Sequence, residues 1–150
     1  MKRASAALPA GISISSTSAL DEIKVLLAAC GLPTDDLRHD GVFVVARAGA
    51  ELCGTAGIEA FGAAALLRSV AVRSAWRGRG IARALCQEVM RRASAMQVRR
   101  LFLLTTDAQQ FFLGLGFATV ERDSLPAEIR ATAQFRDLCP QTALAMARDL

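Results

Sequence analysis

The 150-residue sequence lacks tyrosine altogether, and it contains one histidine and four cysteines that lie far apart. Structural zinc sites need several cysteine and histidine ligands at short fixed spacings, and no such pair occurs here. Small disulfide-stabilised folds use dense cysteine frameworks, which four scattered cysteines do not resemble. We therefore expect a domain with no metal centre and no disulfides, as is typical of the reducing cytoplasm.

Long apolar runs are also missing, since no stretch approaches the roughly 20 apolar residues that a membrane-spanning helix needs. The first residues, MKRASAALPAG, carry two positive charges, but the apolar stretch after them is too short and proline-broken for a signal peptide. No repeat, long linker or low-complexity tract divides the chain. We expect a flexible tail over residues 1–10 and a single cytoplasmic domain over residues 11–150, without membrane contact.

Arginine is plentiful in one part of the chain. Nine of the eighteen basic residues fall between Arg68 and Arg100, and all nine are arginine. Such a cluster indicates an anionic partner. Single-strand nucleic-acid binders usually interleave stacking rings with positive charge, whereas Trp76 is the one aromatic residue in this segment. A small phosphorylated ligand explains the cluster at least as well, and we expect no nucleic-acid partner.

Strand and helix patterns alternate in an order that predicts an α/β (α+β) fold around a mostly antiparallel sheet of six to seven strands. Ser18 and Asp107 are candidate N-caps for two of the helices. A loop or short helical turn is expected over residues 32–41. The expected strands are 11–16, 42–48, 51–61, 64–72, 98–106, 117–122 and 142–149, and the expected helices are 19–31, 80–95 and 108–115.

Residues 77–82, RGRGIA, lie between a strand that ends at Val72 and a helix that begins near Gly80. A helix start presents N–H groups without intrahelical partners and the positive end of the helix dipole, which together favour an anion. The spacing differs from the phosphate-binding GxxxxGK[ST] and GxGxxG patterns. On these residues alone, a phosphate cradle, a glycine-rich turn beside a solvated helix and an RNA-binding tract all remain open.

The segment LRSVAVRSAWRGRGIARAL resembles the signature of GCN5-related N-acetyltransferases (GNAT), in which a strand ending in L/V-A-V precedes [Q/R]-x-x-G-x-[G/A]. A second segment, LFLLTTDAQQFFLGLGFATVER, is similar to the later strand-helix-strand block of that family, and the two cover roughly residues 64–122. The resemblance implies the GNAT fold, with helices flanking a sheet that is splayed at the acetyl-CoA site. The signature core matches Arg77, Gly78, Arg79, Gly80, Ile81 and Ala82 without a gap.

The resemblance also implies the role of each segment in an N-acetyltransferase. Acetyl-CoA would be the donor, with its pyrophosphate on the N–H groups of residues 77–82. Its pantetheine arm would pair like an extra strand with the backbone of Val70, Ala71 and Val72. A backbone N–H near Val72 would stabilise the oxyanion that forms when a neutral amine attacks the thioester directly, in a ternary complex.

Many GNAT relatives use a tyrosine to protonate the departing CoA thiolate, and the matching position here is Phe112. A phenyl ring cannot donate a proton, so water or the hydroxyl of Thr105 or Thr106 would have to replace it. Thr105 is also a candidate substrate contact. The absent tyrosine bears on the identity of the acid and leaves the reaction class unchanged.

Two charged residues within strands are candidates for the acceptor side of the reaction. Glu59 could deprotonate the amine through a water molecule, the alternative being a strand residue that faces solvent. By simple alternation Arg68 shares a strand face with Val70 and Val72, and its guanidinium could hold a substrate carboxylate bidentately. The alternative for Arg68 is a rim position paired with a structural acid.

The second half of the chain carries a narrower resemblance. LFLLTT, FF…GF and DSLP are similar to the acetyltransferase portion of N-acetylglutamate synthases, and the whole chain is more similar still to small N-acetyltransferases of arsenic-resistance operons. Relatives in that group acetylate the α-amine of glutamate-like toxins such as arsinothricin and phosphinothricin, which implies a small acidic amino acid as acceptor. A homodimer is one candidate assembly. A protein or peptide N-acetyltransferase and a catalytically weak acyl-CoA-binding regulatory module remain as alternatives.

Overall fold

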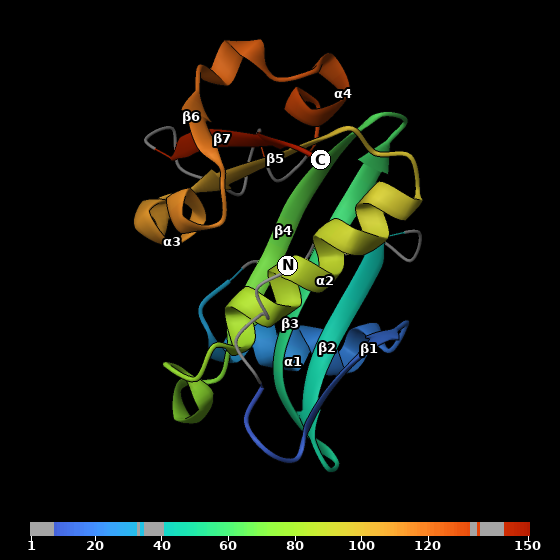
Figure 1. Cartoon of the computed structure of the whole chain (residues 1–150), viewed down its shortest axis with the longest axis vertical. Coiled ribbons are helices and arrows are strands. Elements are labelled where there is room, and N and C mark those ends of the chain that lie inside the picture. The colour runs from blue at the N-terminus through green and yellow to red at the C-terminus, as the bar shows by residue number, and fades with distance from the viewer. Residues whose placement is uncertain (1–7, 33, 35–40, 133–134, 136–142) are drawn as a thin grey trace, which may run out of the picture.

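The computed structural model describes residues 8–32, 34, 41–132, 135 and 143–150. Within these ranges seven strands form one sheet in the order β1-β2-β3-β4-β5-β7-β6 (Figure 1). Neighbouring strands are antiparallel except β4 and β5, so the prediction of a mostly antiparallel sheet of six to seven strands is confirmed. The strands are β1 (Ile12–Thr17), β2 (Val42–Ala48), β3 (Glu51–Phe61), β4 (Ala64–Val72), β5 (Arg100–Thr105), β6 (Ala118–Val120) and β7 (Leu144–Asp149).

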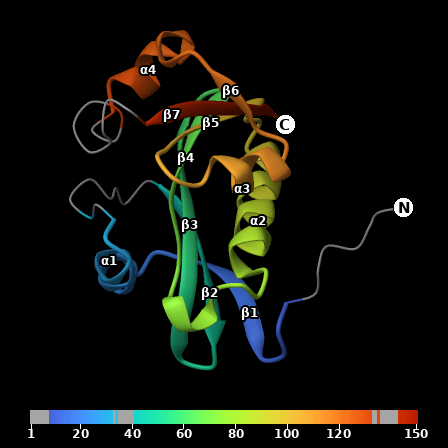
Figure 2. The same ribbon diagram turned by 90° about the vertical axis from the view of Figure 1, so that its left-hand side faces the viewer.

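Helices cover both faces of this sheet. They are α1 (Leu20–Ala29), α2 (Ile81–Ala95), α3 (Gln109–Gly114) and α4 (Ala127–Arg130), with 3₁₀ turns η1 (Ser74–Trp76) and η2 (Arg122–Ser124). Helix α2 packs on one face over the main core cluster, and α1 packs on the opposite face over β2 and β3 (Figure 2). A third cluster joins β4, β5 and β7 to α4. None of the described helices is long and apolar enough to cross a membrane.

Three neighbouring strands, β2, β3 and β4, have the bounds predicted for them. Runs of apolar and β-branched residues form β2, β3 and β4, and short turns separate the runs. Gly49 and Gly62 occupy these turns with φ of 60° and 66°, in the left-handed region that glycine adopts without a steric penalty. The bounds of these three strands therefore follow from local sequence signals.

The predicted N-caps Ser18 and Asp107 were wrong. Helix α1 begins after Ala19 and helix α3 after Ala108, and neither helix has a side-chain cap. At α3 the buried Thr105 accepts a hydrogen bond from the Ala108 N–H at 3.0 Å. Thr105, the last residue of β5, thus holds the start of α3, a role that the sequence had assigned to Asp107. Helix α4 was not predicted, because four residues carry no helical periodicity.

Parts of two predicted segments lie outside the described residues. Residues 1–7 of the expected tail and most of the expected loop over residues 32–41 belong to the undescribed ranges. Leu8, within the expected tail, packs against the main core cluster.

The sheet is splayed between β4 and β5. These strands pair in parallel over one short register only, Ala64–Leu66 with Arg100–Phe102. Beyond Leu66 the strands diverge, and β5 continues alongside β7 instead (Figure 1). Because backbone groups on the facing edges of diverging strands lose their ladder partners, such a gap favours a ligand that can supply new ones.

Candidate active site

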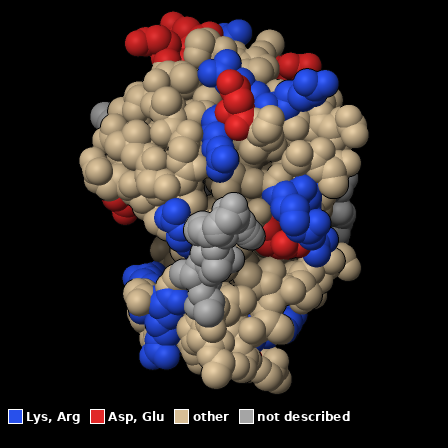
Figure 3. Space-filling view, in the orientation of Figure 1, with Lys and Arg blue, Asp and Glu red and all other residues tan. Residues whose placement is uncertain are grey.

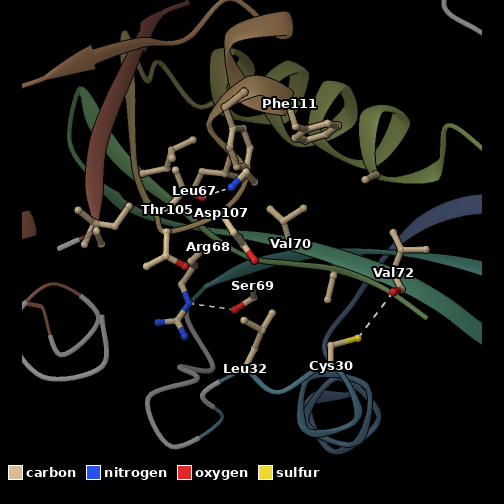
Figure 4. Close-up of a pocket in the computed structure, with 18 of the residues that line it drawn as sticks. Cys30, Leu32, Leu67, Arg68, Ser69, Val70, Val72, Thr105, Asp107 and Phe111 are labelled. Atoms are coloured by element: carbon tan, nitrogen blue, oxygen red, sulfur yellow. Dashed lines mark hydrogen bonds between the residues drawn. The ribbon is translucent and has the colours of Figure 1, made fainter. Parts of the chain in front are cut away.

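A cavity of about 780 Å³ lies in the gap between β4 and β5. One wall is the run from Leu67 to Val72 of β4, and the other is the run from Leu103 to Ala108, at the end of β5 and in the connection to α3 (Figure 4). Residues that follow α1, the rings of α3, and Arg77, Ala82 and Ala143 also line it. The structure thus brings Arg68, Thr105 and the backbone of residues 70–72 to one cavity.

A β-bulge at Ser69 interrupts the alternation of β4. Thr55 pairs with Ala71 but Gly57 pairs with Arg68, so β4 holds one extra residue in this interval. Ser69 absorbs it with a φ of 59°, which is unusual for a residue other than glycine. The side chain of Val72 therefore joins the core under α2, while Ala71 packs under α1. The prediction that Arg68 shares a strand face with Val70 and Val72 was wrong, because a bulge shifts side-chain parity by one.

Arg68 forms a buried ion pair with Glu59. The Arg68 Nη1 lies 3.3 Å from the Glu59 Oε2, with side-chain exposures of 2% and 9%. The Arg68 Nε also donates to the Ser69 hydroxyl at 3.1 Å, so the bulge residue helps to orient the guanidinium. Arg68 lines the cavity, whereas Glu59 is not among the described residues that do so. Sequence reasoning had assigned these two residues separate roles, and the structure joins them in one contact.

The end of β4 is held from two sides. The Arg77 Nε donates to the Val72 carbonyl at 2.8 Å, and the Cys30 thiol at the end of α1 lies 3.7 Å from the same oxygen. The Arg77 guanidinium also contacts the Cys30 sulfur at 3.8 Å. The predicted phosphate-contacting residue Arg77 thus uses its side chain to fix the strand end.

The connection from β4 to α2 has the geometry of an anion site. Gly78 and Gly80 have φ of 77° and 82°, and Gly80 is the N-cap of α2, where no side chain caps the helix. The first turn of α2 contains no acidic residue. A 15-residue helix whose first N–H groups lack side-chain partners attracts an anion through those groups and through its dipole.

Several side chains of this connection have structural roles. The Arg79 guanidinium lies 5.0 Å from the Trp76 ring centre, and Ile81 is buried in the core. Ala82 lines the cavity. Blue side chains lie over the turn that precedes α2 in the space-filling view (Figure 3). The backbone of residues 77–82 is therefore the part that fits a phosphate, with positive charge around it.

Aromatic rings form the α3 end of the cavity. Phe112 is 6% exposed and makes edge-to-face contacts with Phe111 at 5.0 Å and Phe117 at 5.6 Å. Phe111, Phe112 and the hydroxyl-bearing Thr105 and Thr106 all line the cavity. The position that corresponds to the family tyrosine is thus occupied by a packed ring, with two hydroxyls on the same cavity.

Two of the described cysteines, Cys53 and Cys86, are buried away from the cavity. Burial raises the pKa of the Cys86 thiol to about 12, and it also raises that of Cys53, so both stay protonated at neutral pH. Neither residue lines the cavity. No group of three or more potential metal ligands occurs among the described residues.

Cys30 and Asp107 are among the cavity residues that sequence reasoning missed. Cys30 was read only as part of a helix, and Asp107 was read as a helix cap. A signal for Asp107 was available, because it follows a strand that borders the predicted splay. Cys30 had no such signal, since only the tertiary packing of α1 brings it to the end of β4.

Known proteins share this sequence pattern and this fold. A family model described as an acetyltransferase (GNAT) domain matches residues 39–119. N-acetylglutamate synthase from Neisseria gonorrhoeae, complexed with coenzyme A and N-acetyl-glutamate, has a TM-score of 0.78 and 22% identity over 95% of this chain. The present chain spans only 36% of that synthase.

Two smaller proteins match over nearly their whole length. Rv2747 from Mycobacterium tuberculosis, in complex with CoA, has a TM-score of 0.76 and 22% identity over 92% of this chain and 99% of its own. An acetyltransferase from Streptococcus agalactiae has a TM-score of 0.72 and 18% identity over 94% and 99%. At such identities the structural likeness demonstrates a shared fold.

Proposed function

Because the chain belongs to the acetyltransferase (GNAT) family, whose model covers more than half of it, we propose that it transfers the acetyl group of acetyl-CoA to the α-amine of a small acidic amino acid. Glutamate-like toxins such as arsinothricin and phosphinothricin are included in this class. The N-acetyltransferase family predicted from residues 64–122 is confirmed. The acceptor, the link to arsenic resistance, the cytoplasmic location and a homodimer stay predictions.

The observation that carries the proposal is the splayed cavity beside the uncapped start of α2. An acyl-CoA combines a pyrophosphate, an extended amide-bearing arm and a reactive thioester at its end. The N–H groups of residues 77–82 suit the pyrophosphate, and the free edge of β4 suits the arm. In this proposal the cavity holds the thioester, and the acceptor lies beside Arg68 and Thr105, which line it.

The orientation of the Val72 peptide supports its role as oxyanion donor. The neighbouring Arg73 N–H donates to Cys53 of β3 at 2.8 Å, so the Val72 backbone groups point away from β3 and into the splay. The Val72 carbonyl already accepts from Arg77. The Val72 N–H lies on the same side of the strand and therefore points toward the place where an oxyanion would form. Stabilisation of an oxyanion by one such donor is typically worth about 3–4 kcal/mol.

We infer that Arg68 binds a carboxylate of the acceptor. A guanidinium is a rigid planar fork of N–H donors that matches a carboxylate, and Arg68 lines the cavity while it contacts Glu59 and Ser69. Arg68 reaches the cavity although the bulge turns it away from the side-chain face of Val72. An acidic amino acid matches this cationic wall better than a neutral amine does.

Glu59 was predicted as a candidate base, and its environment favours a different contribution. A proton on Glu59 would remove the charge that balances Arg68 in their buried pair, and breaking such a pair from one side typically costs about 3–5 kcal/mol. We therefore assign Glu59 to holding Arg68. Protonation of the CoA thiolate falls to water or to the hydroxyl of Thr105 or Thr106.

Substrate-dependent release of CoA tests the proposal. Wild-type protein would be incubated with acetyl-CoA and each of glutamate, phosphinothricin, arsinothricin, alanine and a short peptide, and free thiol would be measured. We expect turnover with the acidic acceptors and little with alanine. Turnover of the peptide alone would identify a peptide N-acetyltransferase, and CoA binding without any turnover would identify a binding module; either result contradicts the proposal.

A further inference from the structure

Among its described lining residues, the cavity between β4 and β5 contains a single acidic side chain, that of Asp107. We propose that the Asp107 carboxylate binds the α-ammonium of the acceptor amino acid and takes up the proton that this group loses before it attacks the thioester. The inference rests on the proposed function and adds to it a residue that contacts the reacting nitrogen.

The fold fixes Asp107 at the corner of the cavity. Only residues 106–108 connect β5 to α3, and Asp107 is the middle one. The Ala108 N–H donates to the buried Thr105 hydroxyl at 3.0 Å, which closes the turn around Asp107. Figure 4 shows Asp107 at this corner and Arg68 on β4, both drawn around the same cavity. A short, tethered connection can present a carboxylate in a reproducible position.

Charge complementarity favours a zwitterion between the two walls. Arg68 and Arg77 line the cavity from β4 and from the start of the α2 connection, and both are cationic. An amino acid carries a carboxylate and an ammonium on the same carbon atom. Two guanidinium groups alone would repel the ammonium, whereas an acid on the opposite wall attracts it and orients the nitrogen.

Exposure distinguishes Asp107 from Glu59 as a proton acceptor. Asp107 is exposed, so a proton that reaches its carboxylate can pass to bulk water. Glu59 is buried, which separates it from solvent, and its negative charge balances the guanidinium of Arg68. The exposed acid at the cavity corner therefore suits repeated proton uptake and release, and the buried acid suits a fixed position.

The transfer then balances as follows. The ammonium gives one proton to the Asp107 carboxylate, and the nitrogen lone pair forms a bond to the acetyl carbon. The carbon–sulfur bond breaks and its electron pair leaves on the CoA sulfur. The second nitrogen proton ends on that sulfur, through water or a threonine hydroxyl, and Asp107 returns its proton to solvent. The products are the N-acetyl amino acid, CoA thiol and one proton.

Calorimetry with two ligands that differ in the ammonium tests the inference. L-Glutamate and glutarate would be titrated into the CoA-loaded wild type, Asp107→Asn and Asp107→Ser. The control is Asp123→Asn, an exposed acid in η2 that does not line the cavity. We expect both Asp107 variants to bind glutamate about tenfold to a hundredfold more weakly, the usual loss for one charge-assisted hydrogen bond, and glutarate unchanged. Their kcat should also fall, while Asp123→Asn resembles wild type.

The outcomes separate this inference from the proposed function. Glutamate turnover by wild type with unchanged glutamate affinity in both Asp107 variants would overturn the role of Asp107 and leave the function standing. Equally weakened binding of glutamate and glutarate would overturn it too. Glutarate has no ammonium, so a loss of affinity shared by both ligands would reflect general damage to the cavity. Wild-type protein that neither binds nor acetylates any acidic amino acid would overturn both.

Discussion

Replacing Arg68 should separate its part in folding from its part in substrate binding. Arg68→Met leaves the Glu59 carboxylate at 9% exposure without the cation that lies 3.3 Å from it. Removing one member of a buried pair typically lowers the free energy of unfolding by about 3–5 kcal/mol. Replacing both members by apolar residues of similar size is often neutral, so Arg68→Met/Glu59→Met should recover most of this loss.

Arg68→Lys addresses substrate binding without removing the charge. A lysine keeps the cation beside Glu59 but lacks the planar fork that binds a carboxylate bidentately. The loss of that contact typically costs about 1.5–3 kcal/mol, or roughly tenfold to a hundredfold in the affinity for an acidic acceptor. Acetyl-CoA affinity should barely change, because the proposed contacts of the donor are with the backbone of residues 70–72 and 77–82.

Urea unfolding of the four proteins measures the first effect, and steady-state kinetics with glutamate and a neutral amine measures the second. A double variant that is no more stable than Arg68→Met would show that the pair with Glu59 is not the origin of the loss. Equal loss of activity toward acidic and neutral acceptors in Arg68→Lys would refute the carboxylate role of Arg68.

Three further predictions concern other parts of the molecule. Phe112→Tyr should leave kcat unchanged or raise it, because a phenol can only add a proton donor at the cavity; a folded but inactive variant would contradict this reading. Gly57→Ala should lower the free energy of unfolding by about 1–3 kcal/mol, since its Cβ would lie 2.6 Å from a neighbouring ring, whereas Gly114→Ala in α3 should not; equal denaturation midpoints would refute the packing argument. Arg77→Leu removes the 2.8 Å hydrogen bond to the Val72 carbonyl and should lower kcat by releasing the strand end, and an unchanged kcat would show that this bond does not position the site.

The parts of the fold that could be predicted from the sequence are those that depend on short, local sequence patterns. The bounds of β2, β3 and β4 followed from apolar runs separated by glycine turns, and α2 followed from the helical spacing after Gly80. The bulge at Ser69 could not be predicted, because a serine in the left-handed region carries no residue-type signal. Its consequence, the altered side-chain face of β4 beyond Arg68, was therefore missed as well.

Sequence could predict the part of the candidate site that consists of contiguous backbone groups. It was less able to predict contacts between side chains of different strands. The glycine turn and the helix start are contiguous in sequence, so residues 77–82 could be proposed as a unit. The contact between Glu59 and Arg68 depends on the register of β3 against β4, which the bulge modifies. Cys30 comes to the cavity from the end of α1, which only tertiary packing reveals, whereas Asp107 closely follows β5 in the chain.

The affinity for CoA of Gly80→Asp tests the central claim most directly, namely that the backbone at the start of α2 binds the donor. Gly62→Asp is the matched control, because Gly62 has a similar φ of 66° in the β3–β4 turn and equally open space for a Cβ. Both variants place aspartate in the left-handed region and gain the same charge, and the start of α2 additionally favours a carboxylate, so Gly80→Asp should be at least as stable as Gly62→Asp. Calorimetry should show CoA binding weakened about tenfold or more in Gly80→Asp, since the new carboxylate repels the pyrophosphate, and unchanged in Gly62→Asp. Equal CoA affinity in wild type and a folded Gly80→Asp would contradict the account.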